Sequence, residues 1–188
     1  MLYTGKGDKG TTKVIDSKER FSKGSDLAEA LGSLDELNSF IGLCKFKARQ
    51  MQDGGVTVGH KEEKTSDILR QAQENLFIIQ AQVAGADKKI NKAKVTKLEK
   101  IIDTIEQEIP PLKGFSIAGG TELSSLLDIA RTLARRTERR VVLVKEMGSR
   151  KLPGYTLPYL NRLSSLLFAL ARLSNHRSGV KEKRPSYK

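Results

Sequence analysis

Residues 157–175 read LPYLNRLSSLLFALARLSN, an apolar stretch in which polar side chains occur only at intervals. Leu163, Leu167 and Leu170 recur at the three- and four-residue spacings of a buried helix face. Pro158 suits the first turn of such a helix. Because so few positions are polar, we expect this helix to pack on more than one side, with a neighbouring subunit as one option.

Four segments upstream show the same helical spacing of apolar residues. Pro110-Pro111 prevents the third of them from continuing. Five helices in succession predict an all-α protein, a five-helix up-and-down bundle, because an α/β sheet would need several β-branched runs and only residues 13–15 supply one. The four segments are predicted to run from Ser25 or Asp26 to Arg49, from Thr65 or Ser66 to Gly85, from Lys92 to Ile109, and from Thr121 to Met147. Caps are predicted for three of them, at Ser25 or Asp26, at Thr65 or Ser66, and at Thr121.

The chain length of 188 residues suits a single domain with a core of its own. We divide it into an extended, glycine-rich N-terminal arm (1–24), a helical bundle (25–176) and a tail (177–188) that is predicted to be disordered. Residues 54–64, between the first two helices, are expected to form a loop. The N-terminus lacks the apolar run of a signal peptide and no segment suits a membrane span, so we expect a cytoplasmic protein that does not enter membranes.

The composition is basic, with 34 Lys and Arg against 22 Asp and Glu and a formal net charge of +12. Such a chain attracts anions, but the charge does not decide between phosphorylated small molecules, nucleic acid and acidic lipid. Metal-ligand chemistry is rejected because the only histidines, His60 and His176, do not form the Glu-x-x-His pairs of di-iron bundles. Cys44 has no second cysteine with which to pair and is expected to be a small core residue.

The arm contains GKGDKG at residues 5–10, which matches the G-x-G-x-x-G pattern of dinucleotide-binding proteins. The context excludes that motif, since too few residues precede Gly5 for a strand and no helix follows Gly10. It is not a Walker A loop either, because Thr11 stands where that loop has lysine. Three glycines, two lysines and the hydroxyls of Thr11 and Thr12 still suit a site for an anion. A flexible basic terminus is the alternative.

The fourth predicted helix carries the arginine-rich sequence RTLARRTERR at residues 131–140. At 100° per residue, one polar stripe forms on the side away from the apolar face that we predict for Leu126, Ile129 and Leu133. Arginine suits forked contacts with phosphate, which favours a phosphate site over a solvated surface. Arg136 and Arg140 project elsewhere and fit a solvated face. The predicted stripe contains Asp128, Arg131, Arg135, Glu138 and Arg139.

Polar residues also interrupt the apolar faces of two other helices. Asn161 and Ser165 lie opposite the leucines of the fifth helix, where Asn161 is either a buried amide with a partner on another helix or a contact to a nucleotide. On the first helix, Asn38 interrupts the apolar stripe. Asp35 beside it is expected to be partly buried and to meet an arginine of the fourth helix or of another subunit, and an exposed, unpaired Asp35 is the alternative.

Five motifs in register, taken together, resemble the PduO-type ATP:corrinoid adenosyltransferases. They are YTGKGDKGTT (3–12), GSLDELN (32–38), FSIAGGT (115–121), ARTLARRTERR (130–140) and YLNRLS (159–164). The resemblance implies a five-helix bundle assembled as a homotrimer, with ATP and a corrinoid, cob(I)alamin, bound at each subunit interface. It also implies Mg²⁺ on the ATP phosphates and a corrinoid reductase as a partner.

The resemblance assigns a role to individual positions. Phe115 is expected to lie against the corrin face and displace its lower ligand, whereas Arg131 and Asp35 match a pair that bridges subunits. Together with Arg135 these are the expected catalytic residues. The expected nucleotide-binding residues are Thr4, Gly5, Lys6, Gly7, Asp8, Gly10, Thr11, Thr12, Lys13, Lys23, Arg135, Arg136, Glu138, Arg139 and Asn161.

Departures from the family pattern are few. Gly5-Lys6 replaces a basic residue followed by Thr, Ala118 replaces a Pro, Thr137 an Ala and Ser165 an acid. The implied reaction is attack by a cob(I)alamin-like nucleophile on the 5′ carbon of ATP, with triphosphate leaving. The alternative function is a basic helical bundle that binds nucleic acid through its arginines. A purely structural oligomer is a third hypothesis, and neither alternative explains the glycine-rich arm or the loop that carries Phe115.

Overall fold

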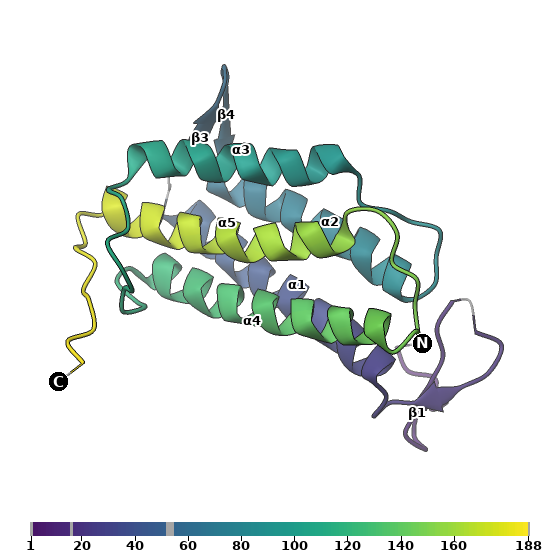
Figure 1. Ribbon diagram of the computed structural model, residues 1–188. Coiled ribbons are helices and arrows are strands. Elements are labelled where there is room, and N and C mark those ends of the chain that lie inside the picture. Colours follow the sequence, from purple (N-terminus) through teal and green to yellow (C-terminus); the bar gives the residue numbers. More distant parts are fainter. Residues whose placement is uncertain (1, 16, 52–54, 188) are drawn as a thin grey trace.

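The computed structural model describes residues 2–15, 17–51 and 55–187. Five helices cross back and forth, each antiparallel to the one before it (Figure 1). The predicted all-α, five-helix up-and-down bundle is therefore confirmed. The helices are α1 (Asp26–Gln50), α2 (Thr65–Val83), α3 (Lys92–Glu108), α4 (Glu122–Glu146) and α5 (Thr156–Arg177).

Helix α5 lies inside the bundle and packs against α3, α4 and α2 of its own protein. Its apolar character is thus explained within one protomer. Tyr159 is fully buried, and burial raises the pKa of its hydroxyl to about 12. That hydroxyl accepts a hydrogen bond from the Asn75 amide of α2 at 3.1 Å, so the one polar atom of this large side chain has a partner.

The buried face of α4 differs from the predicted one. Leu126 and Leu133 are only half-buried and Ile129 is 48% exposed. The buried face includes Ala130 and Ala134, whose small side chains let α1 and α5 approach α4 closely. The predicted inward face was therefore wrong at Ile129, which leaves apolar surface on the outside of α4. It was right at Ala134, Val141 and Val144, which the sequence also placed in the apolar pattern of this helix.

Two of the predicted helix caps are confirmed and one is wrong. The side chains of Ser25 and Thr121 accept hydrogen bonds from backbone N–H groups of the first turns of α1 and α4. Helix α2 begins differently, because Lys64 occupies the N-cap position and makes no side-chain cap bond there. Thr65 is instead fully buried in the first turn, directly after a strand.

The segment before α2 was predicted to be a loop, and this prediction was wrong over the residues that the structure describes. Strands β3 (Gly55–Val58) and β4 (Lys61–Lys64) form an antiparallel hairpin that stands above α3 in Figure 1, whereas Gly54 lies outside the described residues. Val56 is buried, and its partner Glu63 has Lys97 of α3 at 2.8 Å. Burial works to raise the pKa of Glu63, but hydrogen bonds from Lys97 and Gln71 outweigh it and lower the pKa.

The N-terminal arm lies at the end of the bundle where α1 begins and α4 ends (Figure 1). The regular structure among its described residues is the two-residue pairing of β1 (Thr11–Thr12) with β2 (Phe21–Ser22). Cys44 is buried in the core as expected, and burial raises the pKa of its thiol to about 12. Among the described residues, no helix is both long and apolar enough to cross a bilayer.

Candidate functional site

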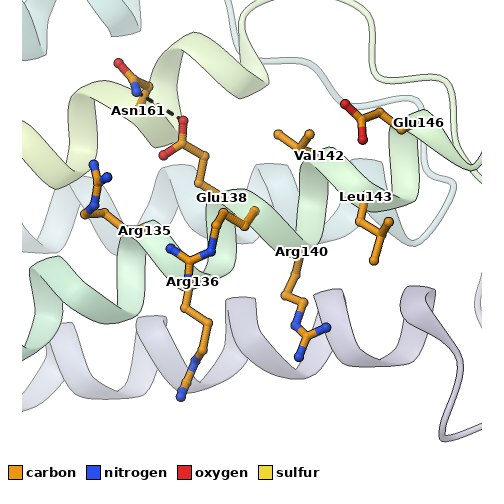
Figure 2. Close-up of a pocket in the computed structure, with 9 residues that line it drawn as sticks. Arg135, Arg136, Glu138, Arg140, Val142, Leu143, Glu146 and Asn161 are labelled. Carbon is orange, nitrogen blue, oxygen red and sulfur yellow. Dashed lines mark hydrogen bonds between the residues drawn. The ribbon is translucent and has the colours of Figure 1, made fainter.

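The first candidate site is a hollow of about 640 Å³ along the C-terminal half of α4 (Figure 2). Four arginines and two glutamates contribute to its walls, so the surface is strongly charged. Most of the predicted arginine stripe thus borders a single concavity, which suits a polyanionic ligand held by forked donors. The lining residues are Arg135, Arg136, Glu138, Arg139, Arg140, Val142, Leu143, Glu146 and Asn161.

Two arginines on one side of this hollow reach toward α1. Figure 2 shows Arg136 and Arg140 extending away from the side on which Glu138 meets α5. Arg136 forms an ion pair with Glu36, and the Nε of Arg140 lies 3.5 Å from a carboxylate oxygen of Glu29. The prediction that these two arginines project away from the stripe is confirmed. Such half-exposed ion pairs stabilise the fold little.

A hydrogen bond between α4 and α5 forms another part of the wall. The Asn161 amide donates to the Glu138 carboxylate at 3.1 Å (Figure 2). Its amide oxygen accepts from Arg162 at 2.7 Å. Asn161 is exposed at the hollow, so the interpretation of a buried amide was wrong. Its position leaves the amide next to any ligand in the hollow.

A second hollow of about 350 Å³ lies beside the first and is formed by α4, α5 and the loop after α3. Phe115 stands at this hollow with 78% of its surface exposed. Arg135 lines both hollows, so the two hollows adjoin at this residue. The second hollow is lined by Leu112, Gly114, Phe115, Ser116, Arg131, Arg135, Ser164, Ser165 and Phe168.

The loop that carries Phe115 is fixed at its end by α5. The Asn175 side chain accepts a hydrogen bond from the Thr121 amide at 2.9 Å and donates one to the Gly119 carbonyl at 2.8 Å. At Gly120 the backbone has a φ of +126°, and a Cβ there would lie 2.2 Å from the Asn175 oxygen. Only glycine fits this close approach, which explains the Gly-Gly pair before α4.

Arg131 belongs to a short chain of contacts that leads to the same loop. Its Nε lies 3.2 Å from Asp128, and the other oxygen of that carboxylate accepts from the Gly119 amide at 3.4 Å. Its guanidinium also lies over the Phe168 ring, 5.7 Å from the centroid. Within a protomer Arg131 thus pairs with Asp128, and Asp35 is exposed on α1 rather than partly buried.

Among the residues of the arm that the structure describes (2–15 and 17–24), none lines either hollow of one protomer. Its conformation is held locally: the Lys23 amide donates to the Gly10 carbonyl at 2.9 Å, and the Arg20 side chain donates to Thr11 at 2.8 Å. A Cβ at Gly7 would lie 2.9 Å from the Lys23 amine, so this lysine and the glycine loop are close together. The predicted convergence of arm and arginine stripe does not occur inside one protomer.

Three residues that line the second hollow or hold its loop were not given these roles by the sequence: Phe168 lines the hollow, and Asn175 and Asp128 contact the loop at Gly119. Asn175 appeared only as the predicted end of a helix, and Asp128 only as a member of the stripe. Phe168 is the one phenylalanine in the fifth helix, a signal that could have singled it out. Among the described residues, no group of three or more His, Cys, Asp or Glu could hold a metal ion.

Comparison with known proteins identifies relatives over nearly the whole chain. Corrinoid adenosyltransferase from Bacillus subtilis is 42% identical over 95% of this chain and 89% of its own length. The corrinoid adenosyltransferase PduO of Citrobacter freundii is 37% identical over 93% of this chain, which spans about half (50%) of that longer protein.

Solved structures of PduO-type adenosyltransferases have a similar fold. A phenylalanine-to-alanine variant of the PduO-type ATP:corrinoid adenosyltransferase from Lactobacillus reuteri, complexed with cobalamin and ATP, has a TM-score of 0.83. Its sequence is 31% identical, and the match covers 99% of both chains. An arginine-to-lysine variant complexed with ATP has a TM-score of 0.82 at 30% identity, over 98% of this chain and 99% of that one. The family model for cobalamin adenosyltransferase matches residues 2–174, and the chain therefore belongs to this family.

Proposed function

We propose that this protein transfers the 5′-deoxyadenosyl group of ATP to the cobalt of a reduced corrinoid and releases triphosphate. The observation that carries the proposal is the position of Arg135 between two adjoining hollows, one rich in arginine and one bordered by exposed aromatic and apolar side chains. ATP and cobalamin occur together in a related structure. The polyanionic ATP suits the arginine-rich hollow, and the corrin ring of cobalamin suits the hollow with the exposed aromatic and apolar side chains. Two unlike substrates that must react with each other require two adjoining sites.

The first hollow is the proposed nucleotide site. Arg135 and Arg139 would bind phosphate oxygens, and the Asn161 amide would face the adenosine. The arm from Thr4 to Lys13, with Lys23, would complete the site across a subunit interface, because it does not reach the hollow of its own protomer. Mg²⁺ would arrive on the ATP phosphates, which fits a site with few carboxylates, since this ion keeps water and phosphate ligands.

The second hollow is the proposed corrinoid site. Phe115 would lie against the lower face of the corrin ring and exclude a ligand from the cobalt, which makes cobalt easier to reduce. Its high exposure supports this role, because a ring of this size on a fixed loop presents apolar surface for a partner. Ser165 stands at this hollow where the family has an acid, so the contacts to the corrinoid there are neutral.

The proposed reaction needs positioning and charge stabilisation rather than a general acid or base. The cobalt electron pair forms a bond to the 5′ carbon while the bond from that carbon to the triphosphate oxygen breaks. The leaving triphosphate takes the electron pair and gains negative charge. Arg135, which lies between the two hollows, is placed to stabilise this charge in the transition state.

The proposed assembly is a homotrimer with the sites at its subunit interfaces. Exposed apolar side chains on two adjacent helices, Ile129 of α4 and Leu43 and Phe46 of α1, supply a surface for another subunit. Asp35 is exposed on α1, the helix that carries Leu43 and Phe46, and is available to Arg131 of a neighbouring protomer. We therefore expect Asp35→Ala to weaken the trimer, measured by sedimentation velocity at decreasing protein concentration.

The matched control for Asp35→Ala is Asp103→Ala, which removes an exposed carboxylate from α3. It should leave the sedimentation coefficient unchanged at every concentration. A wild-type protein that sediments as a monomer would contradict the proposed assembly. The protein is further proposed to act in the cytoplasm with a corrinoid reductase as the source of electrons.

The proposed activity is tested by mixing the purified protein with chemically reduced cobalamin and ATP and following the absorbance change as the cobalt–carbon bond forms. We expect turnover that depends on both substrates. Absence of turnover by folded protein, over a range of Mg²⁺ concentrations, would overturn the proposal. The nucleic-acid alternative finds no support among the relatives. It relies on Arg135, Arg136, Arg139 and Arg140, and two of these, Arg136 and Arg140, are paired with α1 carboxylates.

A further inference from the structure

Arg172 of α5 is the only buried basic side chain among the residues that the structure describes, with 9% of its surface exposed. It lies outside both hollows, and the proposed mechanism does not use it. A buried guanidinium is costly unless its donors are paired. The partners of Arg172 therefore indicate what this position does.

Its main partner is the C-terminal tail. The Nε of Arg172 lies 2.6 Å from one carboxylate oxygen of Glu182, and an Nη lies 3.0 Å from the other. This forked arrangement is the strongest form of such a pair. The same Nη donates to the Pro110 carbonyl at 2.8 Å, so one side chain joins α5, the tail and the start of the loop after α3.

The tail also contacts the loop directly. The carbonyl of Lys183, next to Glu182, accepts a hydrogen bond from the Ile117 amide at 2.8 Å. Pro110, which Arg172 contacts, precedes Phe115 in the sequence, and Ile117, which the tail contacts, follows it. The loop is therefore held on both sides of the exposed ring. Figure 1 shows the loop and the tail at the same end of the bundle.

We propose that the Arg172–Glu182 ion pair fastens the tail across the loop that carries Phe115, and that Arg172 is thereby a positioning residue for this ring. The positioning role of Arg172 rests on the proposed corrinoid site. The ion pair also gives the tail a defined position up to Lys183, in place of the disorder predicted from its sequence.

The test uses the full-length Glu182→Ala variant, which breaks the pair but changes only a partly exposed tail residue. Hydrogen exchange at the Ile117 amide reports the fastening without any substrate. We expect exchange to accelerate on the order of 10-fold or more, since a charge-assisted contact has been lost. The KM for the corrinoid should rise by a similar factor while the KM for ATP stays within about 2-fold, because ATP binds in the other hollow.

Two further variants separate this role from general stability. Arg172→Met removes the charge but keeps an apolar side chain of similar length, so it leaves no unpaired buried charge, and it should reproduce both effects. Lys181→Ala changes an exposed tail residue beside the pair and should change neither measurement.

An unchanged hydrogen-exchange rate at the Ile117 amide in Glu182→Ala would contradict the proposal that the ion pair fastens the tail to the loop. Faster exchange with an unchanged KM for the corrinoid would overturn the positioning role alone. If the wild type lacked adenosylation altogether, the proposed function would fail, and the exchange measurement would still decide whether the tail is fastened.

Discussion

The two ends of the bundle differ in how firmly they are held. At one end, the loop that carries Phe115 is bonded to α5 through Asn175, to α4 through Asp128 and to the tail through Ile117. At the other end, the glycine-rich arm is exposed over most of its length and pairs mainly with itself. The contrast indicates that the proposed corrinoid site is largely preformed in one protomer, whereas the nucleotide site is completed by other groups.

This difference has a physical basis. A ring that excludes a ligand from a metal must be held in place before the substrate arrives, and rigid support costs nothing at the moment of binding. A triphosphate, in contrast, is bound by backbone amides and lysines that can close around it. The cost of ordering such a segment is met when the ligand binds. The comparison therefore predicts larger structural changes at the arm than at the loop.

The largest effect is expected from deleting the arm up to Gly10. The bundle should remain folded, because none of the described residues up to Gly10 belongs to the hydrophobic core. The KM for ATP should rise by about 10²-fold or more, since at least two charge-assisted contacts of roughly 1.5–3 kcal/mol each would be lost. Steady-state kinetics and thermal unfolding would be measured on the same sample. An unchanged KM for ATP would contradict the proposal that the arm completes the nucleotide site.

The next effect in size is expected from Phe115→Ala. Loss of the ring should slow adenosylation by about 10²-fold, the scale that a misaligned reacting group costs. Binding of ATP, measured by titration calorimetry, should change by less than about 2-fold because Phe115 does not line the first hollow. Equal losses of ATP binding and of rate would show that the two hollows are not independent sites.

A smaller effect is expected from Gly120→Ala, which tests how firmly the loop is held. The new Cβ would meet the Asn175 side chain and force a φ of +126° on alanine, with a cost of about 1–3 kcal/mol. Chemical denaturation would measure this loss. Gly114→Ala is the matched control, because its φ of +117° imposes similar strain with nothing within 4 Å of the new Cβ. If both variants lost equal stability, the contact with Asn175 would be unimportant.

Much of the fold could be predicted because helical periodicity and caps are local signals. Ser25 and Thr121 mark the starts of α1 and α4 by their own hydrogen bonds, and Pro110 limits α3. Ile129 was wrongly assigned to the buried face of α4 because burial depends on which neighbours approach. Ala130 and Ala134 admit α1 and α5, and the larger Ile129 is left outside, a result that periodicity alone does not determine.

The candidate site was predictable where residue type carries the chemistry and not where contacts between distant segments do. Repeated arginine at Arg135 and Arg139 indicated a phosphate site from the sequence itself. The roles of Asn175 and Arg172 depend on segments more than 50 residues away, at Gly119 and Pro110. No spacing in a single sequence reveals such contacts. The hairpin at residues 55–64 was missed because its four-residue strands are too short to show a clear alternation.

The most direct test of the account is the rate of adenosylation by Arg135→Ala at saturating ATP and reduced cobalamin. Arg135 borders both hollows and is exposed, so its loss should leave folding intact. We predict that kcat falls by about 10²- to 10³-fold, the effect of removing one donor that stabilises transition-state charge. A kcat within a few-fold of the wild type, in a variant with unchanged thermal unfolding, would contradict the claim that the two substrates meet at this guanidinium.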